Sequence, residues 1–265
     1  MNKKQNVHQF KIFKQENRKI SMITAYDYAF AKLVNSSNID SILVGDSLAM
    51  VMHGYPSTVN ATVEMMALHT AAVARGAPDK FVIADMPFLS YRKDKVQALD
   101  AVQALVQAGA EAVKLEGVMG HENMISHIVE SGIPVMGHIG LTPQSIHQIG
   151  GFKVQGRDRE QADYLMTQAK KIQELGCFAI VLECVPAELA GYITRSLSIP
   201  TVGIGAGQEV SGQILVLQDL LGMSLEFKPK FLRHFLQGSE LIVDALNRFD
   251  KQVKTLEFPT RQESY

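Results

Sequence analysis

The sequence predicts a single parallel (β/α)8 barrel, with an extra helix before the barrel and further helices after it. Three observations lead to this prediction. Short apolar runs rich in β-branched residues recur along the chain, amphipathic helical stretches lie between them, and a glycine often separates a helix from the next strand. The length of 265 residues agrees, because such barrels commonly run to about 250 residues as one domain. We therefore expect one domain over residues 1–265.

Seven segments have the near-continuous apolarity that is typical of strands buried on both faces. They are MITAYD at 22–27, SILVGD at 41–46, FVIADM at 81–86, AVKLEG at 112–117, PVMGHIG at 134–140, AIVLEC at 179–184 and PTVGIGAG at 200–207. An eighth strand is expected near 214–217, where the apolar run is weaker. Eight parallel strands favour a closed barrel over an open sheet.

The segment 94–108 illustrates the predicted connecting helices. Asp94 can cap its first turn, and Gly109 supplies a C-terminal stop. Its apolar residues recur at helical spacing and are Val96, Leu99, Val102 and Leu105. The same order of helix, glycine and strand repeats with Gly76, Gly132 and Gly176. Helices of this length suit right-handed crossovers between parallel strands.

Three further segments complete the predicted organisation. Residues 8–19 are expected to form the extra helix before the barrel, and residues 231–254 mix apolar and charged residues at helical spacing. Both segments are expected to be peripheral. The segment 141–157 is rich in glycine and polar residues and is long for a strand-to-helix connection, which favours an active-site loop.

Composition excludes several classes of protein. Hydrophobic residues make up 46% of the chain and charged residues 20%, which is typical of a globular protein. The net charge of -1 argues against nucleic-acid binding, which normally needs a basic surface. The polar N-terminal segment and the lack of a run of about 18 apolar residues argue against export and membrane spanning. Because Cys177 and Cys184 form no disulfide framework, we expect a cytoplasmic protein.

Ionisable side chains stand at the ends of the predicted strands. They are Asp27, Asp46, Asp85, Lys114 with Glu116, His138 and Glu183. In a barrel these strand ends share one face, and that face carries the active site in essentially every characterised barrel enzyme. The sequence therefore predicts that residues far apart in the chain form one cluster.

Several carboxylates at one mouth would repel one another and raise their pKa values unless a cation neutralised them. A hard divalent ion answers this need, and Mg²⁺ prefers oxygen ligands while keeping positions open for water or substrate. Cysteine and paired-histidine ligands are missing from these positions, which argues against structural zinc. We expect a magnesium site among the strand-end carboxylates.

Each candidate also has a structural interpretation. A single carboxylate at a strand end is most often a helix cap or an ion-pair partner. Asp27 could simply belong to the turn between the first strand and the helix that follows it. His138 alone would more often be a hydrogen-bonded residue of the mouth than a catalyst. The glycines at 203–207 do not match a nucleotide-binding loop, so a tight turn is expected there.

Longer motifs carry a resemblance to a known family. They are VGDS at 44–47, IAD at 83–85, VKLEG at 113–117, GHIGLTPQS at 137–145, GGFKVQGR at 150–157, VLECVP at 181–186 and GIGAG at 203–207. In these motifs the chain closely resembles the ketopantoate hydroxymethyltransferase family, from about Tyr26 to Gly222. Ala49 departs from the glycine expected after DSL, which removes no functional group.

The resemblance implies a reaction and a role for each matching residue. Members of the family make ketopantoate from 3-methyl-2-oxobutanoate and 5,10-methylenetetrahydrofolate, on the route to pantothenate and coenzyme A. Asp46 and Asp85 would bind Mg²⁺ together with the oxoacid, and Glu116 would complete the metal site directly or through water. Ser47 and Lys114 would hold the oxoacid.

The remaining roles follow from the same resemblance. Glu183 would be the proton acceptor in catalysis, and His138 would lie near the substrate. The resemblance also implies a homo-oligomer, because members of the family form rings that are often decamers. The partners expected for this chain are therefore small-molecule substrates and further copies of itself.

Two other functions stay open at the level of sequence. An oxoacid lyase or mutase of the phosphoenolpyruvate mutase and isocitrate lyase type would also use Mg²⁺ and an enolate, but the chain shows no nucleophilic cysteine in a lyase-like loop. A noncatalytic barrel that binds a metal or an oxoacid would leave Lys114 and Glu183 without a reason to share one mouth. A requirement for tetrahydrofolate would separate the predicted transferase from the lyase or mutase, and turnover by the purified chain would decide against the noncatalytic barrel.

Overall fold

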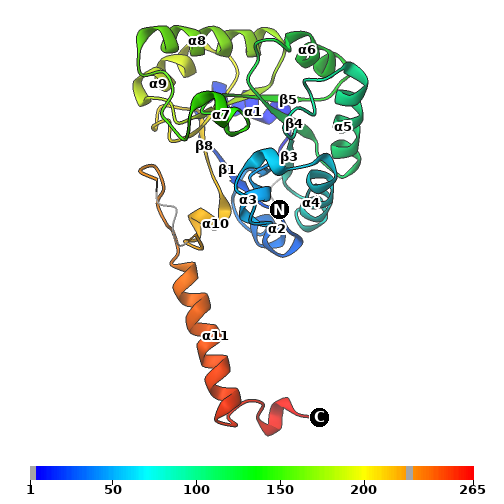
Figure 1. Cartoon of the computed structure of the whole chain (residues 1–265), viewed down its shortest axis with the longest axis vertical. Helices are drawn as coiled ribbons and strands as arrows, with labels where there is room; N and C mark the ends of the chain where they lie inside the picture. Colours follow the sequence, from blue (N-terminus) through cyan, green and yellow to red (C-terminus); the bar gives the residue numbers. More distant parts are fainter. Residues whose placement is uncertain (1–3, 225–228) are drawn as a thin grey trace. The chain divides into compact units, whose positions relative to one another are not determined.

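A computed structural model describes residues 4–224 and 229–265. It divides the chain into two compact units, Met1–Leu215 and Val216–Tyr265. The first unit contains every strand of the barrel, in the ribbon from blue to yellow (Figure 1). The second contains helices α10 (Leu217–Leu220) and α11 (Gly238–Lys254) and a short 3-10 helix, η3 (Arg261–Glu263). The single domain over 1–265 stays a prediction.

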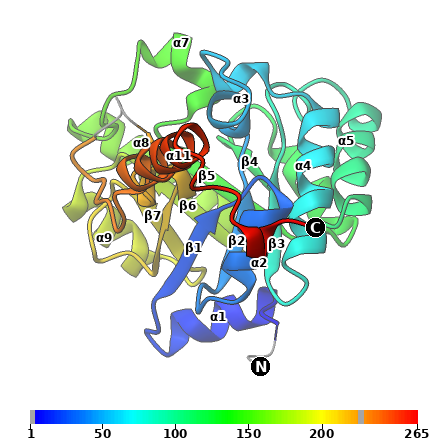
Figure 2. The same ribbon diagram turned by 90° about the horizontal axis from the view of Figure 1, so that it is seen from below.

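Eight parallel strands close the barrel in chain order, and the first pairs with the last. The strands are β1 (Ile20–Thr24), β2 (Ser41–Val44), β3 (Phe81–Asp85), β4 (Ala112–Glu116), β5 (Val135–Gly140), β6 (Ala179–Glu183), β7 (Thr201–Ile204) and β8 (Gly212–Leu215). Figure 2 shows helices surrounding these strands. The predicted fold class is confirmed, including the weak eighth strand, which begins at Gly212, ahead of the predicted segment.

The connecting helices of the barrel unit are α2 (Tyr28–Asn35), α3 (Leu48–Val51), α4 (Val63–Gly76), α5 (Lys95–Gln107), α6 (Glu122–Glu130), α7 (Ile146–Ile149), α8 (Arg159–Glu174) and α9 (Ala187–Ser196). Two 3-10 helices, η1 (Thr58–Asn60) and η2 (Pro143–Ser145), lie within loops. None of the described helices is long and apolar enough to cross a membrane.

Helix α5 confirms the predicted bounds and corrects one of the apolar positions expected on its buried face. Asp94 caps it by accepting a hydrogen bond from the Gln97 backbone, and Gly109 follows it with a φ of 110°. Val96, however, is 70% exposed. The buried positions are Ala98, Ala101, Val102 and Leu105. Val102 and Leu105 are thus buried as the spacing predicts, and alanines rather than Val96 complete the buried face.

Gly76 also differs from its predicted role as a stop. It is the last residue of α4, and a Cβ there would lie 2.6 Å from the Tyr28 carbonyl oxygen of α2. Close approach of two helices, rather than a left-handed turn, requires this glycine. Gly132 and Gly176 do adopt positive φ angles, as expected of helix stops.

The extra helix before the barrel is present as α1 (Val7–Gln15), but the prediction that it is peripheral was wrong. Phe10 is fully buried, and its ring lies 5.6 Å from that of Phe81 and 5.4 Å from that of Phe178. Phe81 begins β3 and Phe178 precedes β6, so these rings meet at the amino-terminal end of the barrel. Phe10 and Phe13 belong to one core cluster with inward residues of the strands. Helix α1 therefore plugs this end of the barrel.

In the second unit, α11 confirms a helix in the predicted segment 231–254, although it begins later, at Gly238. Its apolar side chains are largely exposed in this structure. They include Leu241, Ile242, Val243, Leu246 and Phe249.

Candidate active site at the carboxyl ends of the strands

The alternation of side chains along the strands places the ionisable groups inside the barrel. In β3, Phe81 and Ile83 belong to the apolar core cluster, and Asp85 stands two residues later. Because strand residues alternate faces with a period of two, Asp85 continues the inward row of its strand. The same step leads from Ala112 to Lys114 and Glu116 in β4.

Strands β5 and β6 follow the same rule. Met136 and Val181 lie in the core cluster, and His138 and Glu183 stand two residues beyond them. Neighbouring strands bring Asp85 beside Lys114, and Glu116 beside His138. The barrel interior is thus apolar toward the amino-terminal ends of the strands and carries ionisable side chains at their carboxyl ends, where the sequence predicts the site.

Asp46 and Ser47 reach the site from the turn after β2. The Asp46 backbone N–H donates a hydrogen bond of 3.0 Å to Oδ2 of Asp85, which ties this turn to the next strand. The Ser47 hydroxyl lies 2.8 Å from the hydroxyl of Tyr26. Asp46 is buried, whereas Ser47 is partly exposed at the start of α3.

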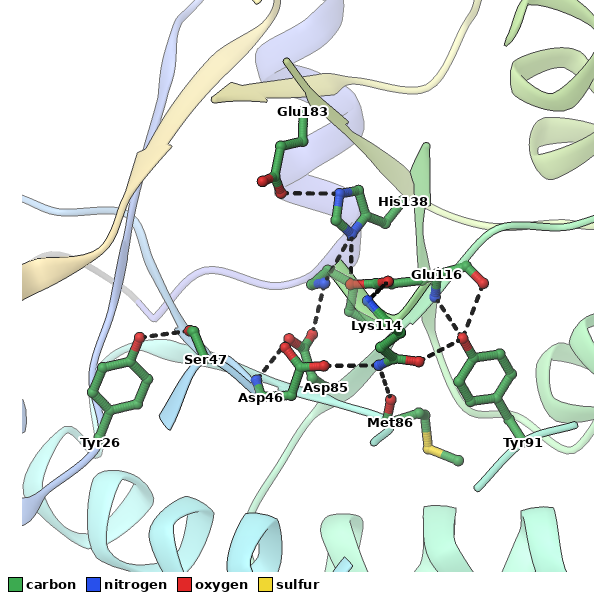
Figure 3. A network of polar contacts seen from close by, with 11 residues as sticks. Tyr26, Asp46, Ser47, Asp85, Met86, Tyr91, Lys114, Glu116, His138 and Glu183 are labelled. Atoms are coloured by element: carbon green, nitrogen blue, oxygen red, sulfur yellow. Dashed lines mark hydrogen bonds and ion pairs between the residues drawn. The ribbon is translucent and has the colours of Figure 1, made fainter. Parts of the chain in front are cut away.

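Direct contacts connect the five strand-borne groups (Figure 3). Lys114 Nζ lies 3.0 Å from Asp85 Oδ1 and 3.3 Å from His138 Nδ1. His138 Nδ1 also lies 3.5 Å from Glu116 Oε1, and its Nε2 lies 3.2 Å from Glu183 Oε2. Glu183 has a side-chain exposure of 19%, against 5% or less for the other four groups. Glu183 is therefore the group of this set that is most open to an incoming substrate.

The buried carboxylates carry a strong electrostatic conflict. Burial, followed by repulsion from Asp85 and Glu116, raises the pKa of Asp46 well above that of an ordinary aspartate. Burial also raises the pKa of Asp85, and the Lys114 ammonium only partly opposes this. Burial raises the pKa of Glu116 as well, but its hydrogen bond and attraction to His138 outweigh that effect, so its pKa is lowered.

The pKa values of the two basic groups are also raised, but by the nearby carboxylates and against the effect of burial. Burial lowers the pKa of Lys114, but the nearby carboxylates, led by Asp85, outweigh burial and raise it above the ordinary lysine value. Burial and Lys114 lower the pKa of His138, while Glu116 and Glu183 raise it, to about 9 as the net result.

Gln144 is a central member of the site that the sequence did not single out. Its Nε2 donates to Asp46 Oδ2 at 2.8 Å and to the Met86 carbonyl at 3.0 Å, and its backbone N–H donates to Glu116 Oε2 at 2.9 Å. It comes from the segment 141–157, which was predicted to be an active-site loop. One residue thus fixes the carboxylate at the end of β4 and the carboxylate in the turn after β2.

Tyr91 supports Gln144 from the loop after β3. Its hydroxyl lies 3.0 Å from Gln144 Oε1 and 2.9 Å from the Glu116 carbonyl oxygen, and Arg92 donates to the same carbonyl. Cys184, directly after Glu183, has a φ of 50°, an uncommon backbone conformation for a residue with a side chain. These positions could not be found from strand periodicity, because they lie in loops.

Other candidates have structural roles. Asp27 caps α2 by accepting a hydrogen bond of 2.8 Å from the Phe30 backbone, so the helix-cap interpretation is the one observed. Gly205 and Gly207 have φ angles of 63° and 76°, in agreement with the tight turn expected at 203–207.

The donor set fits a hard divalent cation in chemistry and charge. Asp46, Asp85 and Glu116 bring three buried carboxylates against the ammonium of Lys114, and a divalent ion would relieve the repulsion that raises the pKa of Asp46. Within residues 4–224 and 229–265, no three carboxylate, histidine or cysteine side chains converge as a ready ligand set. In the structure, Lys114 holds Asp85, and Gln144 holds Asp46.

Comparison with known proteins decides the family. The family model described as ketopantoate hydroxymethyltransferase matches residues 4–261. The chain belongs to the ketopantoate hydroxymethyltransferase family. A curated 3-methyl-2-oxobutanoate hydroxymethyltransferase from Coxiella burnetii is 59% identical over 255 residues, covering 96% of each chain. One of the same name from Bdellovibrio bacteriovorus is 56% identical, covering 95% of this chain and 96% of its own. The resemblance and the predicted transferase class are confirmed.

Solved structures of more distant proteins share the fold. A phosphonopyruvate hydrolase determined with oxalate and Mg²⁺ has a TM-score of 0.63 at 13% identity, covering 97% of this chain and 92% of its own. A 2,3-dimethylmalate lyase of the phosphoenolpyruvate mutase and isocitrate lyase superfamily has a TM-score of 0.62 at 13% identity, with 97% and 89% covered. These similarities establish a shared barrel, whereas membership of the hydroxymethyltransferase family separates this chain from the rival lyase or mutase.

Proposed function

We propose that this chain transfers the one-carbon unit of 5,10-methylenetetrahydrofolate to 3-methyl-2-oxobutanoate and forms 2-dehydropantoate. The observation that carries the proposal is the buried cluster at the ends of β2 to β6, in a member of the ketopantoate hydroxymethyltransferase family. Its residues are the ones that the resemblance assigns to this reaction. The proposed place in metabolism is pantothenate and coenzyme A synthesis.

Asp46, Asp85 and Glu116 would hold one Mg²⁺ ion, with Glu116 acting directly or through water. When bound, the ion would supply a Lewis acid that polarises the keto group of the oxoacid and favours loss of the neighbouring proton. Lys114 places a positive charge against the substrate carboxylate, and Ser47 donates a hydrogen bond to it. The oxoacid is thereby oriented with its C3 atom toward the more open side of the site.

Glu183 is the proposed general base. Its carboxylate takes the proton from C3. Water adds to the methylene group of the folate and both carbon–nitrogen bonds of that group break, so that tetrahydrofolate leaves and formaldehyde remains. The carbon nucleophile adds to this formaldehyde to form the new carbon–carbon bond, and the formaldehyde oxygen takes up a proton and becomes the hydroxyl group. His138 holds Glu183 through the 3.2 Å contact of its Nε2 and so orients the base.

The test is turnover by the purified chain. Formation of 2-dehydropantoate should require 3-methyl-2-oxobutanoate, the folate and Mg²⁺ together, and EDTA should abolish it until Mg²⁺ is added back. A lyase or mutase would act on an oxoacid without folate, and a noncatalytic barrel would bind ligands without turnover. Either of those results would contradict the proposal.

We also propose a cytoplasmic homo-oligomer, with a ring of ten chains as the arrangement expected from the resemblance. The exposed apolar side chains of α11 support a contact with another copy of the chain, because large exposed apolar patches mark interaction surfaces. Sedimentation of the full chain tests this proposal, since a monomer at all concentrations would contradict it.

A further inference from the structure

A cavity of about 340 Å³ lies between the chain segments that follow β2 and β5. One side is formed by Met50 of α3 and by η1, and the other by Pro143 of η2 and by α7. Phe152 completes the lining with its aromatic ring. The volume lies at the lower end of the range for small-molecule pockets, which is roughly 300–1,000 Å³.

Both sides of this cavity come from chain segments that also supply the proposed active site. Met50 stands on the short helix that starts directly after Ser47, so it follows the proposed oxoacid ligands by about one helical turn. Pro143 directly precedes Gln144, whose side chain holds Asp46. A molecule in the cavity would therefore contact the segments that also hold the oxoacid.

The lining favours a neutral ligand. Among the described residues that line the cavity there is no lysine, arginine, aspartate or glutamate. An oxoacid anion would find His147 but no permanent positive charge there, whereas Lys114 provides one in the neighbouring cluster. Met50, Pro143 and Phe152 instead present apolar surfaces of the kind that cover a planar ring.

One polar group in the lining lacks a protein partner. Thr58 is only 4% exposed, and its Oγ1 is buried without a hydrogen-bond partner among the described residues. A buried hydroxyl left unsatisfied is costly, so Thr58 gains by turning its hydroxyl toward a polar group that binds in the cavity. The ligand that fits is an uncharged planar heterocycle with polar atoms on its edge.

We propose that this cavity binds the pterin ring of the folate co-substrate, with the Thr58 hydroxyl bonded to the edge of the ring and Phe152 covering its face. This inference rests on the proposed function, which supplies the folate. A pterin is planar, uncharged at neutral pH and rich in edge donors and acceptors, so it matches the lining. The anionic glutamate tail of the folate would stay outside, because the described lining offers no lysine or arginine.

The test uses Thr58→Val, which keeps the shape of the side chain and removes its hydroxyl. Loss of one hydrogen bond should raise the KM for 5,10-methylenetetrahydrofolate and the Kd for tetrahydrofolate by about tenfold. Phe152→Ala should weaken both by a similar factor; because Phe152 is 62% exposed, this change leaves the core intact. The KM for 3-methyl-2-oxobutanoate should change by less than twofold in both variants.

Thr70→Val is the matched control. Thr70 is also fully buried with an unpartnered hydroxyl among the described residues, but it lies on α4 outside the cavity lining. This variant should bind tetrahydrofolate as the wild type does. A general effect of losing a buried hydroxyl would appear equally in Thr70→Val and would overturn the assignment to the cavity.

The outcomes separate the inference from the proposed function. If the wild type forms 2-dehydropantoate but Thr58→Val and Phe152→Ala bind tetrahydrofolate with wild-type affinity, the pterin lies elsewhere and the inference alone is overturned. If the wild type forms no product with the folate, the proposed function fails and the inference falls with it. A selective loss of folate affinity in both cavity variants is the expected result.

Discussion

The two ends of the barrel are built from the same strands but from opposite kinds of side chain. At the amino-terminal end, Phe10, Phe81 and Phe178 pack ring against ring and bury apolar surface. At the carboxyl end, the same inward rows and the turn after β2 carry carboxylates, and burial raises the pKa of Asp85 and of Asp46. Apolar burial stabilises the fold, whereas buried like charges oppose it. The amino-terminal end of the barrel thus stabilises the fold, and the carboxyl end carries the reactive groups. We expect mutations at the amino-terminal end to lower stability and spare kcat, and a mutation of the catalytic base at the carboxyl end to lower kcat and spare stability.

The largest effect is expected at the carboxyl end, in Glu183→Gln. Glutamine keeps the shape of the side chain but cannot accept the C3 proton, and a positioned general base typically contributes about 10²–10⁴-fold. We expect kcat to fall by that factor while Mg²⁺ affinity survives, since the contact of Glu183 is with His138 rather than with the other carboxylates. Stability should change little.

Hydrogen exchange isolates this step. In deuterated water with Mg²⁺ and no folate, the wild type should exchange the C3 hydrogen of 3-methyl-2-oxobutanoate, because enolisation needs no one-carbon donor. Glu183→Gln should not. Exchange by the variant at the wild-type rate would remove Glu183 from the role of base and leave His138 or a hydroxide as the next candidate.

The opposite signature is expected at the amino-terminal end, in Phe10→Ala. Removing a fully buried phenylalanine costs about 3–5 kcal/mol, and Phe10 is 0% exposed. Urea unfolding should shift by that amount, while kcat of the folded fraction stays near the wild-type value. Ile12→Ala on the same helix is the control, because Ile12 is 39% exposed and should cost far less. Equal losses in both variants would show that α1 is not a plug.

Asp46→Asn tests whether the buried carboxylate of Asp46 lowers the stability of the folded protein. A carboxyl group whose pKa is higher in the folded state makes the unfolded chain the better acid. Stability is therefore lost as the pH rises from the ordinary aspartate pKa through the folded value. Without metal at pH 7, the variant should melt at a higher temperature than the wild type.

Adding Mg²⁺ should reverse the order of the two melting temperatures, so that the wild type melts at the higher temperature. Ligand at about 100 times its Kd stabilises a protein by about 2.7 kcal/mol, and this gain should be present in the wild type and lost in Asp46→Asn. Thermal melts with EDTA and with Mg²⁺ make the measurement at equal protein concentration. A variant that is less stable than the wild type without metal would show that Asp46 is not under electrostatic strain.

Sequence reasoning found the residues whose positions follow from strand periodicity. Asp85, Lys114 and Glu183 could be assigned to one cluster because parallel strands end on one face. Sequence reasoning did not predict that α1 closes the amino-terminal end of the barrel. An amphipathic helix can be recognised from local sequence, but the surface on which it packs, formed by Phe81 and Phe178, exists only once the barrel has closed. Sequence reasoning missed Gln144 as well, because a loop has no period from which the direction of a side chain can be read.

Gln144 gives the last and smallest expected effect, and it tests whether the loop positions the strand-borne carboxylates. Gln144→Leu removes the side-chain donor to Asp46 but keeps the backbone N–H that bonds to Glu116. Groups that orient metal ligands typically contribute about 10–100-fold to metal affinity, so the Mg²⁺ Kd should rise within that range. Tyr91→Phe is the control, since it removes the partner of Gln144 Oε1 and leaves the donor to Asp46 in place. Its effect on Mg²⁺ should be smaller, whereas an equal loss in both variants would indicate that packing around the loop, rather than the hydrogen bond to Asp46, sets the affinity.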